Sequence, residues 1–140
     1  MKKILIVDAQ GGGMGRQLIA GIRKAIPDAY IMAVGTNSVA ASAMRKAGAD
    51  ETASGENSVV VAARKADLIV GPVGMVIADS MLGEITPRMA VSIGQADARR
   101  ILIPFNNCDN YVAGAGAKST GQLIIEAVEQ VRLFLEEQGQ

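Results

Sequence analysis

The sequence predicts an α/β fold, a Rossmann-like three-layer sandwich with a parallel sheet of four to five strands. Short, continuously apolar segments alternate with amphipathic helical segments, which is typical of a parallel sheet covered on both faces. Four glycines, at positions 11, 12, 13 and 15, lie directly between the first apolar segment and the first helical one. Because crossovers between parallel strands are right-handed, we expect the strand order 3-2-1-4-5.

The first elements are a buried strand, a helix and a second strand. Residues 3–8 contain the apolar run 4–7 and are predicted as a buried strand, and residues 15–26 repeat apolar side chains at helical spacing. Pro27 ends this helix. Residues 29–34 form the next apolar strand, which Gly35 interrupts.

The second helix follows at once, because residues 36–38 offer three side chains that favour the N-cap position. It runs to about Ala47, and Gly48 suits the position that ends a helix. Residues 49–53 lie where another strand is expected, but they are polar, so their assignment stays open. Residues 56–65 have the pattern of a third helix.

The second half begins with the apolar strand 67–71, followed by a predicted helical stretch over residues 75–82 that ends at Gly83. Thr86 followed by Pro87 is a helix start, with an N-cap and a first-position proline, and this helix runs to about Ala96.

Residues 100–104 form the last strand, and a loop rich in Asn and Gly covers residues 105–117. Ser119 and Gln122 then make a capping box for a long final helix. The apolar face of that helix comprises Leu123, Ala127, Val128, Val131 and Leu135.

Length and composition restrict the class of protein. A chain of 140 residues fits a single domain, and with 3% aromatic residues its core must be aliphatic. Its 14 basic and 14 acidic residues lack the excess positive charge with which a protein grips nucleic acid. No apolar run is long enough to span a membrane, and the start is too short for a signal peptide.

The few reactive side chains are equally informative. One Cys and the lack of an export signal lead us to expect a cytoplasmic protein. The chain contains no His, which removes the commonest general base, the Ser–His and Cys–His pairs and most zinc sites. We therefore expect no metal.

The glycine-rich segment is the main candidate site, because bare backbone N–H groups at a helix start bind phosphate. It is not a complete dinucleotide fingerprint, since Gln10 or Ala9 stands where one of the three glycines is required. Nor is it a P-loop, because Arg16 follows the last glycine. The alternative is a turn needed only for close packing. The residues expected to bind the ligand here are Asp8, Gln10, Gly11, Gly12, Gly13, Met14 and Gly15.

Two more loops are expected at the same crevice, where the winding of the sheet reverses between strands 3–8 and 67–71. One is Gly71-Pro72-Val73-Gly74, and the other begins with Thr36, Asn37 and Ser38. No acidic residue follows strand 29–34 to bind a ribose 2′-hydroxyl, so this loop favours NADP(H) over NAD(H). The alternative for it is a plain helix N-cap.

Other polar residues carry weaker hypotheses. Asp8 is a candidate for Mg²⁺, a ribose or a substrate amine, but bonding to N–H groups of its own loop is favoured. Asp79 and Glu84 are a possible carboxylate pair, with solvent exposure and first-turn helix polarity as the alternatives. Cys108, within Asn106–Asn110, is a nucleophile candidate or simply a small, partly buried side chain. The residues interpreted as core or interface filler are Met32, Met44, Met75, Met81 and Met89.

Seven segments carry a resemblance to known proteins: 8–15, 33–38, 47–50, 55–57, 71–74, 77–87 and 101–104. Together they resemble a family of short bacterial proteins catalogued only as a domain of unknown function. The resemblance covers residues 1 to about 112 and implies a stand-alone domain without naming a substrate. A family member typically carries Gly in place of Ala9, which would improve the glycine fingerprint.

Three functions remain open. The first is a nucleotide- or NADP(H)-binding homo-oligomer, a dimer or tetramer joined through the final helix. The second is a regulatory module that senses a nucleotide or contacts a protein without turnover. The third is an enzyme acting on a small phosphorylated metabolite, because Gly35-Thr36 and Gly71-Pro72 resemble loops of methylglyoxal-synthase-like domains, which rely on a His absent here. Whether the protein is an enzyme stays undecided.

Overall fold

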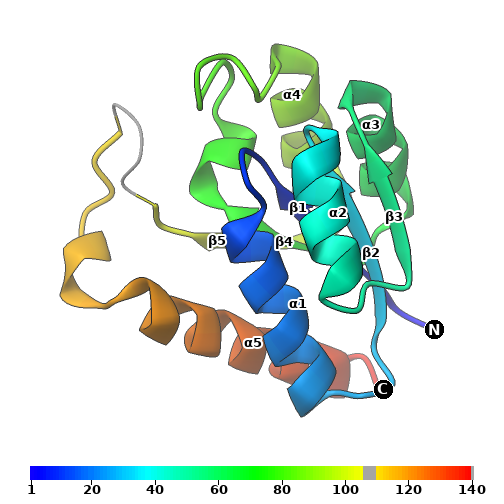
Figure 1. Cartoon of the computed structure of the whole chain (residues 1–140). Coiled ribbons are helices and arrows are strands. Elements are labelled where there is room, and N and C mark those ends of the chain that lie inside the picture. The colour runs from blue at the N-terminus through cyan, green and yellow to red at the C-terminus, as the bar shows by residue number, and fades with distance from the viewer. Residues whose placement is uncertain (106–109, 140) are drawn as a thin grey trace.

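A computed structural model describes residues 1–105 and 110–139. Its five strands form one parallel sheet in the order β3-β2-β1-β4-β5, which confirms the predicted fold class and strand order (Figure 1). Because all five strands are parallel, their carboxyl ends lie at the same edge of the sheet, which we call the carboxyl edge. The strands are β1 (Lys3–Asp8), β2 (Tyr30–Gly35), β3 (Glu51–Ser54), β4 (Leu68–Pro72) and β5 (Arg99–Ile103).

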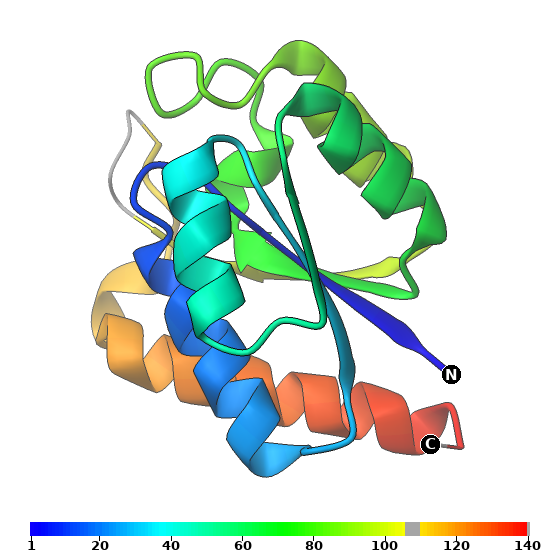
Figure 2. The same ribbon diagram turned by 45° about the vertical axis from the view of Figure 1, so that its right-hand side comes forward.

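Helices cover both faces of the sheet. Helices α1, α2 and α5 contribute to the core on one face, and α3 and α4 to the core on the other (Figures 1 and 2). Successive residues of a strand point to opposite faces, so Ile4 and Ile6 join the first core while Leu5 and Val7 join the second. The helices are α1 (Gly13–Ala25), α2 (Ser38–Lys46), α3 (Glu56–Lys65), α4 (Pro87–Gln95) and α5 (Thr120–Glu137).

The predicted starts of α4 and α5 are confirmed. Thr86 caps α4 by accepting a hydrogen bond from the N–H of Met89, and Ser119 with Gln122 forms the capping box of α5. The predicted apolar face of α5 packs on the core, together with Ile124 and Phe134, which the helical pattern missed. Among the described residues, no helix is long and apolar enough to cross a membrane.

The open question about residues 49–53 is answered by β3, a short strand at one edge of the sheet. It pairs with β2 alone, from Met32 opposite Glu51 to Gly35 opposite Ser54. Three of its four residues are exposed. An edge strand with exposed side chains has no need of a continuous apolar sequence, which explains why the pattern was ambiguous.

The predicted helix over residues 75–82 is wrong. A short 3₁₀ helix, η1 (Val73–Val76), leads instead into a series of turns. Asp79, Met81 and Leu82 have φ angles of 66°, 58° and 56°, which a right-handed helix excludes. The Ser80 hydroxyl donates to the carbonyl of Gly74 at 2.7 Å and holds the turns against η1. We call residues 77–85 the 77–85 loop.

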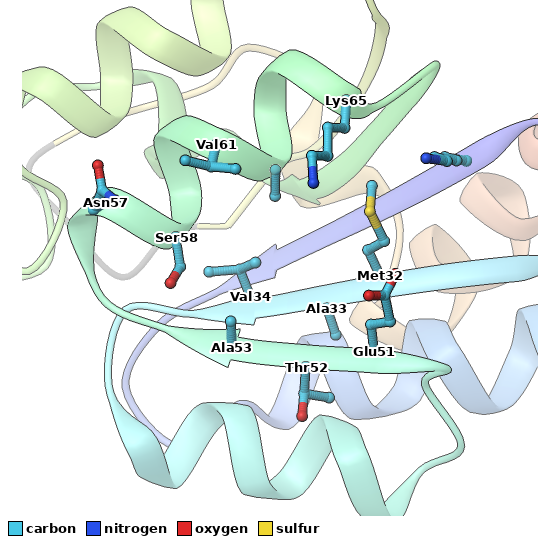
Figure 3. Close-up of a pocket in the computed structure, with 12 residues that line it drawn as sticks. Met32, Ala33, Val34, Glu51, Thr52, Ala53, Asn57, Ser58, Val61 and Lys65 are labelled. Atoms are coloured by element: carbon cyan, nitrogen blue, oxygen red, sulfur yellow. The ribbon is translucent and has the colours of Figure 1, made fainter.

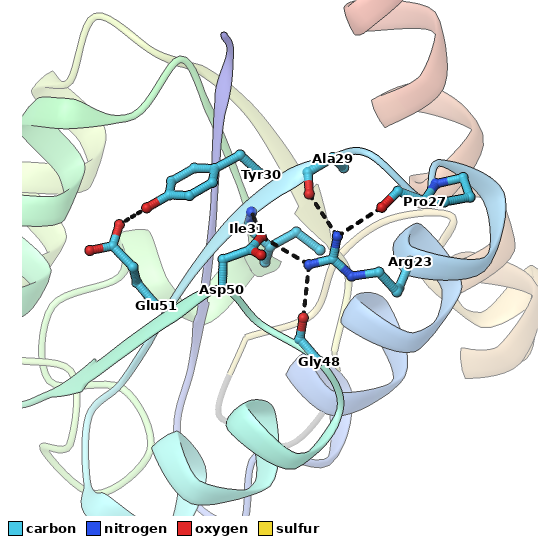
Figure 4. A network of polar contacts seen from close by, with 8 residues as sticks. All are labelled: Arg23, Pro27, Ala29, Tyr30, Ile31, Gly48, Asp50 and Glu51. Carbon is cyan, nitrogen blue, oxygen red and sulfur yellow. Dashed lines mark hydrogen bonds and ion pairs between the residues drawn. The ribbon is translucent and has the colours of Figure 1, made fainter.

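A polar network closes the amino edge of the sheet (Figure 4). The Arg23 guanidinium forms an ion pair with Asp50 at 2.9 Å, and the same carboxylate oxygen accepts the N–H of Ile31 at 2.8 Å. Tyr30 donates its hydroxyl to Glu51. The guanidinium also donates to the carbonyls of Pro27 at 3.1 Å, Ala29 at 2.7 Å and Gly48 at 2.8 Å.

Candidate functional site

Three loops meet at the carboxyl edge of the sheet. They are residues Gln10–Gly13 after β1, which we call the glycine turn, the start of α2 after β2, and the 77–85 loop after β4. Glu84 of the 77–85 loop joins all three by hydrogen bonds to Gln10 and to both Thr36 and Asn37. The hydrogen bonds therefore bring together two of the three predicted loops, the glycine turn and the start of α2, with the 77–85 loop across them.

One oxygen of Glu84 collects all the hydrogen bonds. Oε1 accepts the N–H of Gln10 at 2.8 Å, the hydroxyl of Thr36 at 2.5 Å and the amide of Asn37 at 2.5 Å. Oε2 accepts no hydrogen bond from the described residues. Burial opposes ionisation of Glu84, but these three donors outweigh it and hold the pKa of Glu84 below its ordinary value. The arrangement is a binding position for an anionic oxygen.

Glu84 also corrects the sequence analysis. We found no acidic residue near the end of β2, yet the fold brings in Glu84 from 48 residues beyond Thr36. Glu84 precedes the N-cap of α4, so it is not part of the first helical turn. Asp79 is exposed at a left-handed position and donates its N–H to Ile85, while Glu84 turns to the other loops.

Asp8 is buried beneath the glycine turn and bonds to the N–H groups of its own loop, as we favoured. Its two oxygens accept the N–H of Ala9 at 2.8 Å and of Gly15 at 2.6 Å. Burial raises the pKa of Asp8 more than these backbone hydrogen bonds lower it. Its carboxylate therefore satisfies a donor in the first turn of α1 from below.

Two of the four glycines are explained by packing. Gly12 has a φ of 75°, and a Cβ there would lie 2.8 Å from the Cα of Ala40. A Cβ on Gly15 would lie 2.5 Å from the sulfur of Met44. These glycines allow α1 to pack closely against α2, so the packing alternative is correct for this pair.

Gly11 and Gly13 have a different environment. Both are exposed, neither has a positive φ, and a Cβ on either would meet nothing within 4 Å among the described residues. No hydrogen bond within the described part of the chain uses their N–H groups. The fold as described does not require glycine at these two positions.

A small cavity of about 130 Å³ lies beside the glycine turn. Asp8, Pro72, Met81 and Phe105 contribute to its walls together with the turn itself and Met14. Ligand pockets for whole nucleotides or drug-sized molecules are roughly 300–1,000 Å³, so this cavity admits one small group with the 77–85 loop in its present position.

The remaining predicted residues have mainly structural surroundings. A Cβ on Gly71 would lie 2.5 Å from the carbonyl oxygen of Val7, and one on Gly74 would lie 2.9 Å from Cε of Met81. Of Gly71, Pro72, Val73 and Gly74, the one that lines the cavity is Pro72.

The start of α2 contains both a cap and part of the site. The side-chain oxygen of Asn37 accepts the N–H of Ala40 at 2.9 Å, which is the plain N-cap alternative. Its amide nitrogen faces Glu84 and also donates to the carbonyl of Gln10 at 2.9 Å. Ser38 is exposed at the first position of α2.

Two further expectations from the sequence concern Cys108 and a metal. Cys108 and its neighbours at positions 106, 107 and 109 lie outside the described residues. Within residues 1–105 and 110–139, no group of three or more His, Cys, Asp or Glu side chains is arranged to hold a metal ion.

A second hollow, of about 500 Å³, lies between α3 and the edge strand β3 (Figure 3). Met32, Val34, Ala53 and Val61 form much of its wall, and Lys65 lies at one side. None of the predicted site residues lines this hollow, so we place the candidate site at the glycine turn.

Comparisons with known proteins show the family but no activity. An "FMN-dependent Ubix-like Decarboxylase" from Escherichia coli O157:H7, described as dodecameric, aligns over 91% of this chain and 75% of its own, with 16% identity and a TM-score of 0.46. AibC aligns over 94% of this chain but only 42% of its own, with 18% identity and a TM-score of 0.48. No curated protein matches the sequence. The family described as "Domain of unknown function (DUF3842)" matches residues 3–136, and the chain belongs to it.

Proposed function

We propose that this member of the DUF3842 family binds a nucleotide, with the phosphates at the glycine turn. The observation that carries the proposal is the pair Gly11 and Gly13, which neither backbone conformation nor neighbouring atoms require in the described structure. Glycine lowers stability through its chain entropy, and close approach of a ligand to the backbone is a recognised reason to keep it. The N–H groups of these residues lie at the start of α1, where the helix dipole favours a negative charge.

Glu84 governs the choice between NAD(H) and NADP(H). The preference for NADP(H) depended on the lack of an acid at the end of β2, and that reason no longer holds. A carboxylate that remains on Thr36 and Asn37 repels a 2′-phosphate, whereas a carboxylate that leaves frees both donors for a phosphate. The proposed ligand is therefore a nucleotide, and the position of Glu84 decides between the two cofactors.

The proposal is tested by titrating the purified protein with ADP, NAD, NADP, FMN and inorganic pyrophosphate. A ligand at 100 times its Kd adds roughly 2.7 kcal/mol to stability, which thermal unfolding detects readily. Gly13→Ala and Gly11→Ala should each weaken binding at least about tenfold, because a methyl group would meet the approaching phosphate.

Gly94→Ala is the matched control. Gly94 is exposed in α4, and a Cβ there also meets nothing within 4 Å among the described residues. Gly13→Ala and Gly94→Ala should each leave the free protein equally or more stable, by up to about 1 kcal/mol. Unchanged affinity in Gly11→Ala and Gly13→Ala would contradict the proposal, as would the lack of any response to millimolar ligand in both the wild type and the Glu84→Gln variant described below.

The same titrations separate turnover from sensing. A nucleotide recovered unchanged after long incubation favours a regulatory module, whereas a converted one favours an enzyme. A response to small phosphorylated metabolites, without one to nucleotides, would favour the third hypothesis.

The predicted homo-oligomer and cytoplasmic location remain proposals. On α5, Ile125 and Leu133 are exposed by 72% and 36%, which suits a contact between copies. Sedimentation equilibrium of the wild type and of Ile125→Glu tests the oligomer, with dissociation expected in the variant.

A further inference from the structure

We propose that Glu84 occupies the anion-binding position of this site in place of the ligand, and that a phosphate displaces it and opens the 77–85 loop. This inference depends on the proposed function for the identity of the competing group. It adds an internal competitor, contributed by a distant segment of the same chain.

The donors around Glu84 suit a phosphate oxygen as well as a carboxylate. A backbone N–H, a hydroxyl and a side-chain amide converge on one oxygen at 2.5–2.8 Å. They come from the glycine turn and the start of α2, the two segments we propose for the ligand. Asn37 is held in place by its cap to Ala40 and its bond to Gln10, so the donors keep their arrangement if the carboxylate leaves.

Charge favours displacement over shared occupancy. No ion pair within the described residues neutralises Glu84, and its charge adds to the forces that raise the pKa of the nearby Asp8. A phosphate at the glycine turn would place a second anion beside this uncompensated carboxylate. Two anions that share neutral donors repel each other. The phosphate therefore binds when the Glu84 carboxylate moves away from these donors.

The 77–85 loop has a strained backbone of the kind found at switch regions. Asp79, Met81 and Leu82 all have positive φ angles, which are uncommon for residues other than glycine and cluster at switch regions. Leu82, at the loop tip, is fully exposed. Met81 of the same loop closes one wall of the 130 Å³ cavity, which is too small for a nucleotide. Movement of Glu84 and Met81 together would enlarge it.

The experiment compares Glu84→Gln with the wild type, using inorganic pyrophosphate and ADP as probes in calorimetric titrations. Gln keeps the size of the side chain and an acceptor oxygen but removes the charge, so it repels no phosphate and holds these donors less strongly. If the closed loop holds about 90% of the free wild-type molecules, loss of this preference strengthens binding by up to about tenfold. Glu126→Gln is the control, because Glu126 lies on α5 and pairs with Lys118, and it should bind as the wild type does.

Hydrogen exchange of the Gln10 amide gives a readout that needs no ligand. This N–H donates to Glu84 in the closed arrangement, so in the ligand-free Glu84→Gln variant, where the charged acceptor is lost, its exchange should accelerate. Adding pyrophosphate to that variant should slow the exchange again, because the phosphate takes over the hydrogen bond. Tighter binding together with faster exchange supports the inference.

The other outcomes separate the two proposals. If the wild type binds and Glu84→Gln binds equally or more weakly, Glu84 does not compete with the ligand, and only this inference is overturned. If neither protein binds either probe or any nucleotide, both proposals are overturned. Binding by Glu84→Gln alone supports both, because it identifies a site that the wild-type carboxylate keeps closed.

Discussion

The two edges of the sheet each centre on a carboxylate, but only one of the two networks is neutralised. At the amino edge, Asp50 faces the Arg23 guanidinium, which also binds three backbone carbonyls. At the carboxyl edge, Glu84 receives only neutral donors and has an oxygen without a partner among the described residues. The ion-paired network around Asp50 holds the neighbouring turns in place. The network around Glu84 has no paired cation in the described part of the chain, so another anion can replace its carboxylate.

The largest effect on stability is expected at the carboxyl edge itself, because Gly12 is needed there for packing. Gly12→Ala forces a side chain into a left-handed position and against the backbone of Ala40. We expect a loss of about 3 kcal/mol in the free energy of unfolding. Urea denaturation measures it, and a loss below about 1 kcal/mol would show that the turn adapts and that packing does not explain Gly12.

Arg23→Met should separate the two edges. The substitution keeps much of the apolar stem but removes every hydrogen bond of the guanidinium at the amino edge. Because the pair is partly exposed, we expect a loss of about 1–2 kcal/mol, with ligand affinity at the carboxyl edge unchanged. Denaturation followed by titration measures both, and altered ligand affinity would show that the edges are coupled.

The smallest effect is on pH dependence. Burial opposes ionisation of both carboxylates, but hydrogen bonds lower the pKa of Asp50 and of Glu84 below their ordinary values, with Arg23 also contributing at Asp50. The two carboxylates stabilise the folded state fully at a pH above their ordinary pKa values. This stabilisation is lost as the pH falls through their lower pKa values in the folded protein. Each contributes under about 1 kcal/mol.

Salt distinguishes these two contributions. In 1 M NaCl, screening acts over about 3 Å and weakens the Arg23–Asp50 pair, while the neutral donors of Glu84 are less affected. Denaturation of Asp50→Asn and Glu84→Gln between pH 6 and pH 3, with and without salt, measures the contribution of each carboxylate to the free energy of unfolding. If salt weakens both contributions equally, the amino and carboxyl edges do not differ in how their carboxylates are stabilised.

The fold was predictable because its signals are local. Apolar strands, the Thr86 and Ser119 caps and the glycines at helix starts and ends each act within a few residues and define the elements. The right-handedness of crossovers between parallel strands then leads to the observed strand order. The polar edge strand β3 was ambiguous because pairing on one side only places few demands on its side chains.

The site was predictable only in part. The glycine turn and the start of α2 could be placed from the strands that precede them, but Glu84 reaches Thr36 across 48 residues. No local pattern encodes that contact. The apolar residues of 75–82 suggested a helix, although Met75 is buried and Leu82 is fully exposed in turns. The positive φ angles of this loop depend on its tertiary contacts, which the spacing of apolar residues does not reveal.

The short strand β3 has a consequence for self-association. An exposed strand edge is a template for adding further strands, and proteins that leave one open are prone to form cross-β aggregates. Here β3 has four residues and carries Glu51, while the opposite edge strand β5 begins with Arg99 and Arg100. The shortness of β3 and the charged residues on both edge strands oppose the growth of a continuous intermolecular sheet.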